Sequence, residues 1–163
     1  MFTLDRFAVG ASMSATILSR SSSPDHLKAM TRMISKFYAN VLKRPITPTF
    51  EEYLAILEQN RIAVLLHEDG VLGIATLMLT NTFSGRQGII TEVALDERFF
   101  HTDLVDILIR ELILEAKTLK LKDIVLLTEL RQVTHPVLLE LGFVRDKRMP
   151  YIIPREKIEK FRF

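Results

Sequence analysis

The first sixty residues show two spacings of apolar positions. Residues 15–19 fit a first strand, whereas residues 24–42 place apolar side chains three or four positions apart, which predicts a helix with one buried face. A serine run precedes this helix and a proline opens it, at a position where the missing N–H of proline costs nothing. A shorter helix is predicted over residues 50–59, with Thr49 as its N-cap.

The central part of the chain has the pattern of strands. Residues 61–68 and 71–79 flank an Asp-Gly pair, which predicts a β-hairpin with its turn at residues 69–70. Another strand is predicted over residues 89–95. The polar segment 81–88 lies between these strands, and its polarity predicts a loop.

The remaining chain alternates helix and strand. Residues 103–119 carry Leu and Ile around much of the helix circumference, which predicts a long helix packed against a sheet. A strand over residues 123–130, a short helix over residues 136–141 ended by Gly142, and a last strand over residues 144–153 complete the pattern. The order β-α-α-β-β-β-α-β-α-β predicts a mixed sheet with helices on its faces, in the α/β (α+β) class.

The composition fits one domain and excludes several kinds of chemistry. The 163 residues are 48% hydrophobic and contain no linker, so we expect a flexible arm over residues 1–12 and a single domain over residues 13–163. The absence of cysteine excludes disulfides, thiolate zinc sites and a cysteine nucleophile. A net charge of +2 argues against a nucleic-acid partner. No apolar run approaches a membrane span, so no membrane partner is expected and the cytoplasm is the default compartment.

Three segments, in order, resemble the GCN5-related N-acetyltransferases (GNAT). They are the hairpin LLHEDGVLGIATLML, the strand segment TFSGRQGIITEVALDERF and the helix with its turn THPVLLELGFV. The similarity runs without a gap from Gly88 to Phe143, and the first 60 residues match in layout alone. The resemblance implies a mixed, mostly antiparallel central sheet with helices on both faces, and acetyl-CoA as the cofactor. The loop over residues 81–92 and the helix before it look most like the glucosamine-6-phosphate N-acetyltransferase branch.

The segment that holds the cofactor pyrophosphate in this family is altered here. The family pattern is Arg/Gln-x-x-Gly-x-Gly/Ala before the long helix, where bare backbone N–H groups meet the phosphates. This chain has Phe100 at the Arg/Gln position, and His101, Asp103 and Val105 at the small positions. The resemblance places the cofactor-binding positions, in this degenerate form, at Val93, Ala94, Leu95, Phe100, His101, Thr102, Asp103, Leu104 and Val105.

Two effects are predicted to oppose acetyl-CoA at this helix start. Side chains fill the space of the phosphates, and Asp103 with Asp106 can cap the free N–H groups with the protein's own carboxylates. We therefore expect either no cofactor or weak binding of acetyl-CoA or CoA. The alternative is that the loop tolerates this variation and CoA binds through its pantetheine arm, in the gap between the fourth and fifth strands.

The candidate catalytic residues are Glu92, Tyr151 and Glu129. Glu92 could act as the base for the amine or be a solvated strand carboxylate. It follows Thr91, which stands at the usual position of the acidic residue on the fourth strand, and strict alternation would turn the two side chains to opposite faces. The general-acid Tyr of the family is replaced by Leu138. Tyr151 could substitute for it or serve as a packing residue, and Glu129 could bind an amine or a sugar hydroxyl or be an exposed strand end.

Three functions remain open at this point. The loss of both the loop glycines and the Tyr favours a non-catalytic or weakly active pseudo-acetyltransferase that binds a protein partner or a small-molecule amine. The second is a working acetyl-CoA-dependent N-acetyltransferase for a small amine or amino sugar. The third is a structural subunit that forms a homodimer. The histidines are scattered without ligand-like spacing, so no metal site is predicted.

Overall fold

The computed structural model describes residues 13–68, 70–99, 102–127 and 135–144, apart from a few side chains at the ends of these ranges. In chain order, the elements are β1 (Ser14–Leu18), α1 (Pro24–Asn40), α2 (Phe50–Gln59), β2 (Asn60–His67), β3 (Gly70–Thr82), β4 (Gly85–Leu95), the 3-10 helix η1 (Glu97–Phe99), α3 (Thr102–Thr118), β5 (Ile124–Leu126) and α4 (His135–Glu140). This order confirms the predicted one as far as α4. The arm over residues 1–12 lies outside the described residues, and so does the last strand from residue 145 onward.

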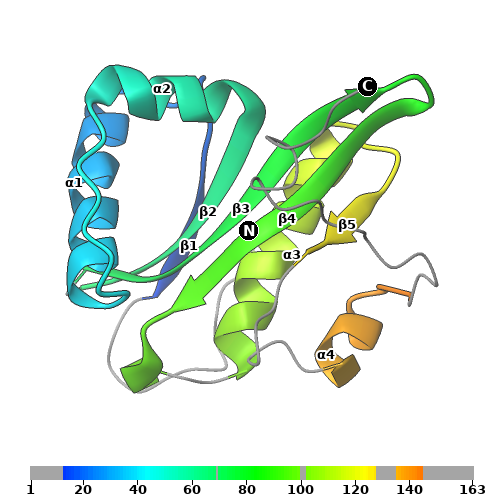
Figure 1. The fold of residues 1–163 in the computed structure, drawn as a ribbon. Helices are drawn as coiled ribbons and strands as arrows, with labels where there is room; N and C mark the ends of the chain where they lie inside the picture. The colour runs from blue at the N-terminus through cyan, green and yellow to red at the C-terminus, as the bar shows by residue number, and fades with distance from the viewer. Residues whose placement is uncertain (1–12, 69, 100–101, 128–134, 145–163) are drawn as a thin grey trace, which may run out of the picture.

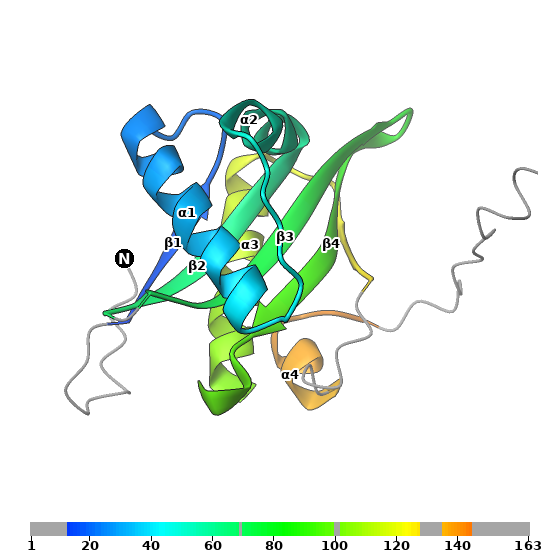
Figure 2. The same ribbon diagram turned by 60° about the vertical axis from the view of Figure 1, so that its left-hand side comes forward.

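The strands form one sheet in the order β1-β2-β3-β4-β5. The pairs β1–β2, β2–β3 and β3–β4 are antiparallel, and β5 runs parallel to β4. In Figures 1 and 2, α1 and α2 lie on one face of this sheet and α3 lies on the other. The structure therefore confirms the mixed, mostly antiparallel sheet with helices on both faces. No helix among the described residues is long and apolar enough to cross a membrane.

The predicted loop over residues 81–88 is wrong, because most of it is strand. β3 continues to Thr82 and β4 begins at Gly85, so only Phe83 and Ser84 form the turn. Gly85 has a φ of +130°, a conformation that a side chain would strain. The tip of this hairpin extends beyond both cores, so its strands do not bury an apolar face there. Their residues are therefore polar, which is also the pattern of a loop.

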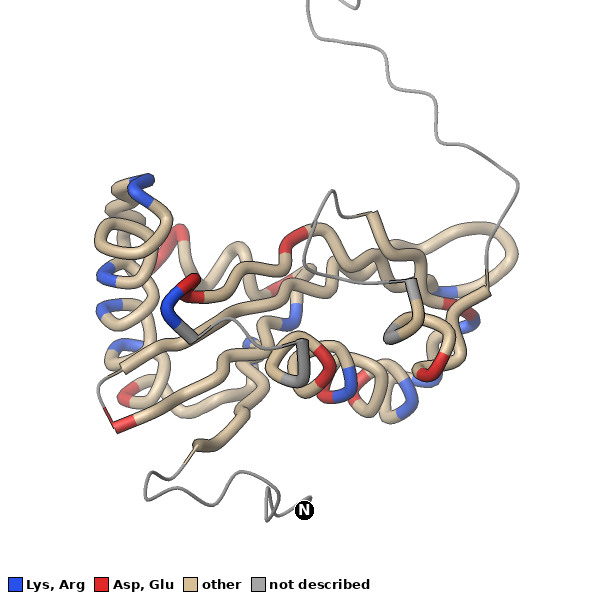
Figure 3. Tube along the Cα trace, turned by 90° about the horizontal axis from the view of Figure 1, so that it is seen from below, with Lys and Arg blue, Asp and Glu red and all other residues tan. Residues whose placement is uncertain are grey.

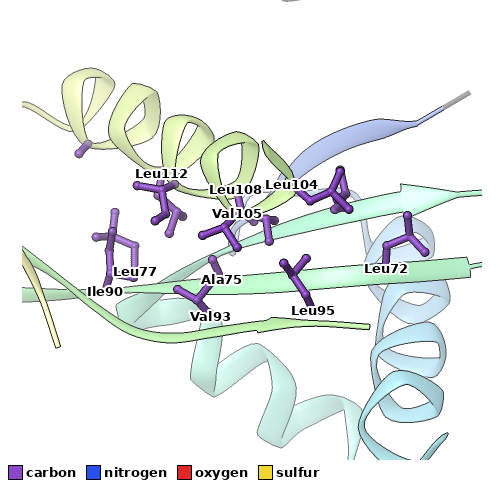
Figure 4. Packing of buried hydrophobic residues seen from close by; sticks show 14 of the residues in the cluster. Leu72, Ala75, Leu77, Ile90, Val93, Leu95, Leu104, Val105, Leu108 and Leu112 are labelled. Atoms are coloured by element: carbon purple, nitrogen blue, oxygen red, sulfur yellow. The ribbon is translucent and has the colours of Figure 1, made fainter. Parts of the chain in front are cut away.

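Two hydrophobic cores, one on each side of the sheet, hold the layers together. Leu108, Ile109 and Leu112 of α3 are fully buried against one face, together with Ile90 and Val93 of β4 (Figure 4). The second core lies beneath α1 and α2, whose buried side chains are Leu27, Met30, Ile34, Phe37, Tyr53 and Leu57. Because the sheet is covered on both faces, its central strands are apolar at nearly every position.

The helix ends follow the predicted local signals. Ser23 caps α1, and Thr49 forms a capping box with Glu52 at the start of α2. Gly142 has a φ of +89° and donates its N–H to the carbonyl of Leu139, so it ends α4 as expected. The outer surface of α1 carries a line of basic positions (Figure 3), among which Lys28 lies over the ring of Phe50, 5.5 Å from its centroid.

Tyr53 is buried in the core beneath α2 with its hydroxyl unpartnered, and this leads to a prediction. The side chain is 3% exposed, and its hydroxyl has no hydrogen-bond partner among the described residues. Burial raises the pKa of Tyr53 above its ordinary value. We expect Tyr53→Phe to raise the free energy of unfolding by about 1 kcal/mol, because it removes a desolvated polar group. Urea denaturation measures the change.

The matched control is Tyr38→Phe. The Tyr38 hydroxyl donates a hydrogen bond to Glu92, so its removal is expected to lower the free energy of unfolding, opposite in sign to the change at Tyr53. A destabilised Tyr53→Phe variant would mean that this hydroxyl has a partner in solution.

Candidate functional site

A β-bulge at Thr91 changes the direction of side chains along β4. Thr76 of β3 pairs with Glu92, and the next residue of β3, Leu77, pairs with Ile90, so Thr91 is an extra residue without a partner on β3. As a result, Ile90 and Val93 both face the α3 core, although they are three positions apart. Strict alternation, which the sequence analysis used to set Thr91 against Glu92, is therefore wrong here, and both residues are exposed.

Glu92 lies on the sheet face that α1 and α2 cover, where two hydroxyl groups bind its carboxylate. The hydroxyl of Tyr38, from α1, donates to Glu92 Oε2 at 3.2 Å, and that of Thr76, from β3, donates to the same oxygen at 3.4 Å. Within the described chain, Glu92 Oε1 accepts no hydrogen bond, and no Lys or Arg forms an ion pair with the carboxylate. Oε2 thus accepts two hydrogen bonds, and Oε1 accepts none from the described residues.

Tyr38 is the functional candidate that the sequence analysis missed. Burial raises the pKa of its hydroxyl, the negative charge of Glu92 and the hydrogen bond to it raise this pKa further, and the positive charge of Arg44 opposes the rise. The hydroxyl consequently stays protonated and can keep donating to Glu92. In the sequence, Tyr38 falls on the apolar face of the first helix, so the pattern indicated packing alone. Its neighbour Phe37, which meets it edge-on, does have that role.

Within the described residues, β5 pairs with the first half of β4. Their parallel pairing runs from Gly88 with Ile124 to Ile90 with Leu126, and Leu127 then donates to the carbonyl of Ile90 at 2.9 Å. Beyond Ile90, β4 pairs with β3 alone in the described part of the chain. The backbone edge of β4 that faces away from β3 therefore has no described strand partner there, at the position where the resemblance implies a pantetheine arm.

Five of the predicted cofactor positions have described side chains, and four of these side chains are buried. Val93, Leu95, Leu104 and Val105 belong to the core beneath α3, and Ala94 packs against the core on the opposite face. These five residues can contact a ligand through their backbone atoms. Their side chains pack into the cores and do not fill the space at the start of α3 where the phosphates were expected. Phe100 and His101, and the side chains of Thr102 and Asp103, lie outside the described residues.

Asp106 is held by a neighbour on its own helix. Its carboxylate accepts a hydrogen bond from Nε of Arg110 at 2.7 Å, one turn further along α3. The expected arrangement, in which Asp106 helps Asp103 to cap the helix, is therefore wrong for Asp106. Because α3 begins at Thr102, Asp103 lies within the first helical turn, where a carboxylate interacts favourably with the helix dipole.

The segment between β4 and α3 is anchored by a buried carboxylate. Asp96 is buried, and it accepts hydrogen bonds from the backbone N–H and the guanidinium of Arg98. These bonds to Arg98 lower the pKa of Asp96 against the opposing effect of burial. The pair links Asp96 to Arg98 at the point where the chain leaves β4.

Of the other residues singled out in the sequence analysis, Leu138 lies within the described part of the chain. Leu138, at the usual position of the Tyr, is half-buried on α4 and packs against the α3 core. Glu129 and Tyr151 lie outside the described residues. Within the described ranges, no group of three or more metal-ligating side chains is present.

Comparison with known proteins identifies the fold. No protein-family model and no curated protein matches the chain by sequence. Solved structures do match it, among them an aminoglycoside acetyltransferase from an uncultured soil metagenomic sample, with a TM-score of 0.67, 14% identity and coverage of 88% of this chain and 98% of that chain. Glucosamine-6-phosphate N-acetyltransferase from Arabidopsis thaliana has a TM-score of 0.61, 16% identity and coverage of 87% and 98%.

A third similar structure was determined with a bound cofactor. The aminoglycoside N-acetyltransferase AAC(6')-Iy in complex with CoA has a TM-score of 0.61, 12% identity and coverage of 91% of this chain and 98% of that chain. The chain therefore has the fold of the GCN5-related N-acetyltransferases, over nearly the full length of these structures. The resemblance found in the sequence is therefore confirmed for the fold.

Proposed function

We propose that this chain binds a protonated amine at Glu92 and does so without efficient acetyl transfer. The observation that carries the proposal is the arrangement of Tyr38 and Thr76 around Glu92. Both hydroxyls use Oε2, so the carboxylate is held in place while Oε1 remains available to an ammonium group. A carboxylate that already has a fixed direction loses less conformational entropy when a ligand binds.

The sequence around α3 and α4 supports the second half of the proposal. The family glycines that let a pyrophosphate approach the helix N-terminus are replaced, at the aligned positions, by His101, Asp103 and Val105. The Tyr that would protonate a leaving thiolate is replaced by Leu138, a residue without a proton to donate. In this proposal the amine site is present, while both the phosphate-binding loop and the proton donor are altered. This combination is expected of a protein that binds an amine without acetylating it.

A working acetyl-CoA-dependent N-acetyltransferase is the second candidate. It is favoured by the fold that the chain shares with acetyltransferase structures, one of which was determined in complex with CoA. In this case Glu92 would accept the proton of the attacking amine, and Tyr38 would hold the carboxylate in position. A protein partner and a homodimer remain predictions.

The amine site is tested by replacing the carboxylate of Glu92 with an amide of the same shape. Titration of the isotope-labelled protein with n-butylamine, followed by backbone amide chemical shifts, is expected to give binding that Glu92→Gln weakens ten-fold or more. The reason is that the amide keeps the hydrogen-bond acceptor but loses the charge that attracts an ammonium group. Amide shifts should also cluster around residues 76 and 92.

The control is Glu68→Gln, at an exposed carboxylate near the turn between β2 and β3. It removes the same charge from a different part of the surface and is expected to leave the affinity unchanged. Equal binding by Glu92→Gln and the wild type would refute the proposed amine site.

A further inference from the structure

An apolar row crosses three strands on the same sheet face as Glu92. Met78 of β3 pairs with Ile89 of β4, and Ile89 pairs with Val125 of β5. Their sequence neighbours Leu77, Ile90 and Leu126 contact the α3 core, so the row itself points to the opposite face. Leu127, two residues beyond Val125 and just past the end of β5, extends the apolar surface.

Neither core uses this row. Val125 is 41% exposed and Leu127 is 44% exposed, while Met78 and Ile89 are half-buried. Figures 1 and 2 show that α1 and α2 lie over the β1 to β3 side of the sheet, and that neither helix extends over β5. No described helix covers this part of the sheet, and a contiguous, partly exposed apolar surface is the kind of surface that a ligand covers.

The row lies next to the carboxylate. Thr76, which pairs with Glu92, and Met78, which pairs with Ile89, are two residues apart on β3 and project from the same face. Two residues of a strand span about 7 Å, which is close to the length of a pentyl chain. An ammonium group at Glu92 and an apolar tail on the row can therefore belong to one small molecule.

We propose, on the basis of the amine site above, that the ligand is an amphipathic amine. Its ammonium group contacts Glu92 Oε1, and its alkyl or aryl group covers Met78, Ile89, Val125 and Leu127. An amino sugar fits this surface poorly, because its hydroxyl groups would lose water over side chains that offer no hydrogen bond. This inference departs from the amino-sugar ligand that the sequence resemblance suggested.

The test compares amines of increasing length on the wild-type protein. We expect the dissociation constant to fall about four-fold for each methylene added from ethylamine through butylamine to hexylamine, as each methylene leaves water for the apolar row. Glucosamine, which carries the same ammonium group on a polar ring, is expected to bind no better than ethylamine. Amide shifts of residues 78, 89, 125 and 127 should grow with chain length.

A pair of matched variants locates the tail. Leu127→Ser is expected to weaken hexylamine binding at least four-fold and to leave ethylamine binding unchanged. Leu114→Ser, at a leucine of α3 with the same 44% exposure, lies on the other side of the sheet and should change neither affinity. Both side chains are partly exposed, so both variants are expected to fold, and circular dichroism checks this.

The outcomes separate this inference from the proposed amine site. Glu92-dependent binding that does not change with chain length, or that is tighter for glucosamine than for hexylamine, overturns the amphipathic ligand and leaves the amine site intact. Absence of Glu92-dependent binding for every amine overturns both. A dimer in light scattering that Leu127→Ser converts to a monomer also overturns the inference, because a second copy would then cover the row.

Discussion

Coenzyme A is expected to bind this chain weakly, and the double change His101→Gly with Asp103→Gly is expected to tighten binding roughly ten-fold or more. A carboxylate near a pyrophosphate costs about 1 kcal/mol or more at a surface dielectric. Each backbone hydrogen bond to phosphate that the glycines make accessible adds about 1 kcal/mol, and 1.4 kcal/mol corresponds to a factor of about ten. Isothermal titration with CoA measures both proteins.

The matched control for this pair is Asp106→Asn. Asp106 stands one turn further along the helix, and Arg110 already neutralises its charge through the 2.7 Å ion pair. Its replacement is therefore expected to change CoA affinity little. Micromolar binding of acetyl-CoA by the wild type would favour the working acetyltransferase instead. An unchanged affinity in the double variant would contradict the argument that the helix start is closed to anions.

Leu108→Ala is expected to lower the free energy of unfolding by about 2–5 kcal/mol, the largest stability effect that we predict. Leu108 has no exposed surface, and it lies on α3 directly over the centre of the sheet (Figure 4). A Cβ placed on Gly73 would approach Leu108 Cδ1 to 3.1 Å, so the side chain already fills the space that this glycine leaves. Its truncation creates a cavity that the helix can close only by moving toward the sheet.

The same helix provides the control. Leu114→Ala removes the same atoms from a side chain that is 44% exposed, and the expected change is below about 1 kcal/mol. Chemical denaturation gives the free energy of unfolding of both variants. Because both are Leu→Ala changes within one helix, the difference between them measures the effect of burial. Equal losses at the two positions would mean that helix formation, and not packing on the sheet, dominates the contribution of α3.

The local elements were predictable because their signals lie within a few residues. The proline and serine run at the start of α1, Thr49 with Glu52 at the start of α2, and Gly142 after α4 each act on neighbouring backbone groups. The apolar spacing of α3 likewise predicted that this helix is buried against the sheet. The hairpin between β3 and β4 was the exception, because its polar tip lies beyond both cores and carries no apolar alternation to read.

The sequence by itself predicted the order of the elements as far as α4 and the class of fold. It also shows which residues replace the glycines of the family pattern before α3, from which weak CoA binding is predicted. Only the tertiary structure decided which side chains meet. The bulge at Thr91 moves Glu92 onto the face of α1, where Tyr38, 54 positions away in the chain, donates a hydrogen bond to it. The apolar row likewise exists only through the pairing of three strands. Such contacts depend on strand register and bulges, which long-range packing sets and no local pattern records.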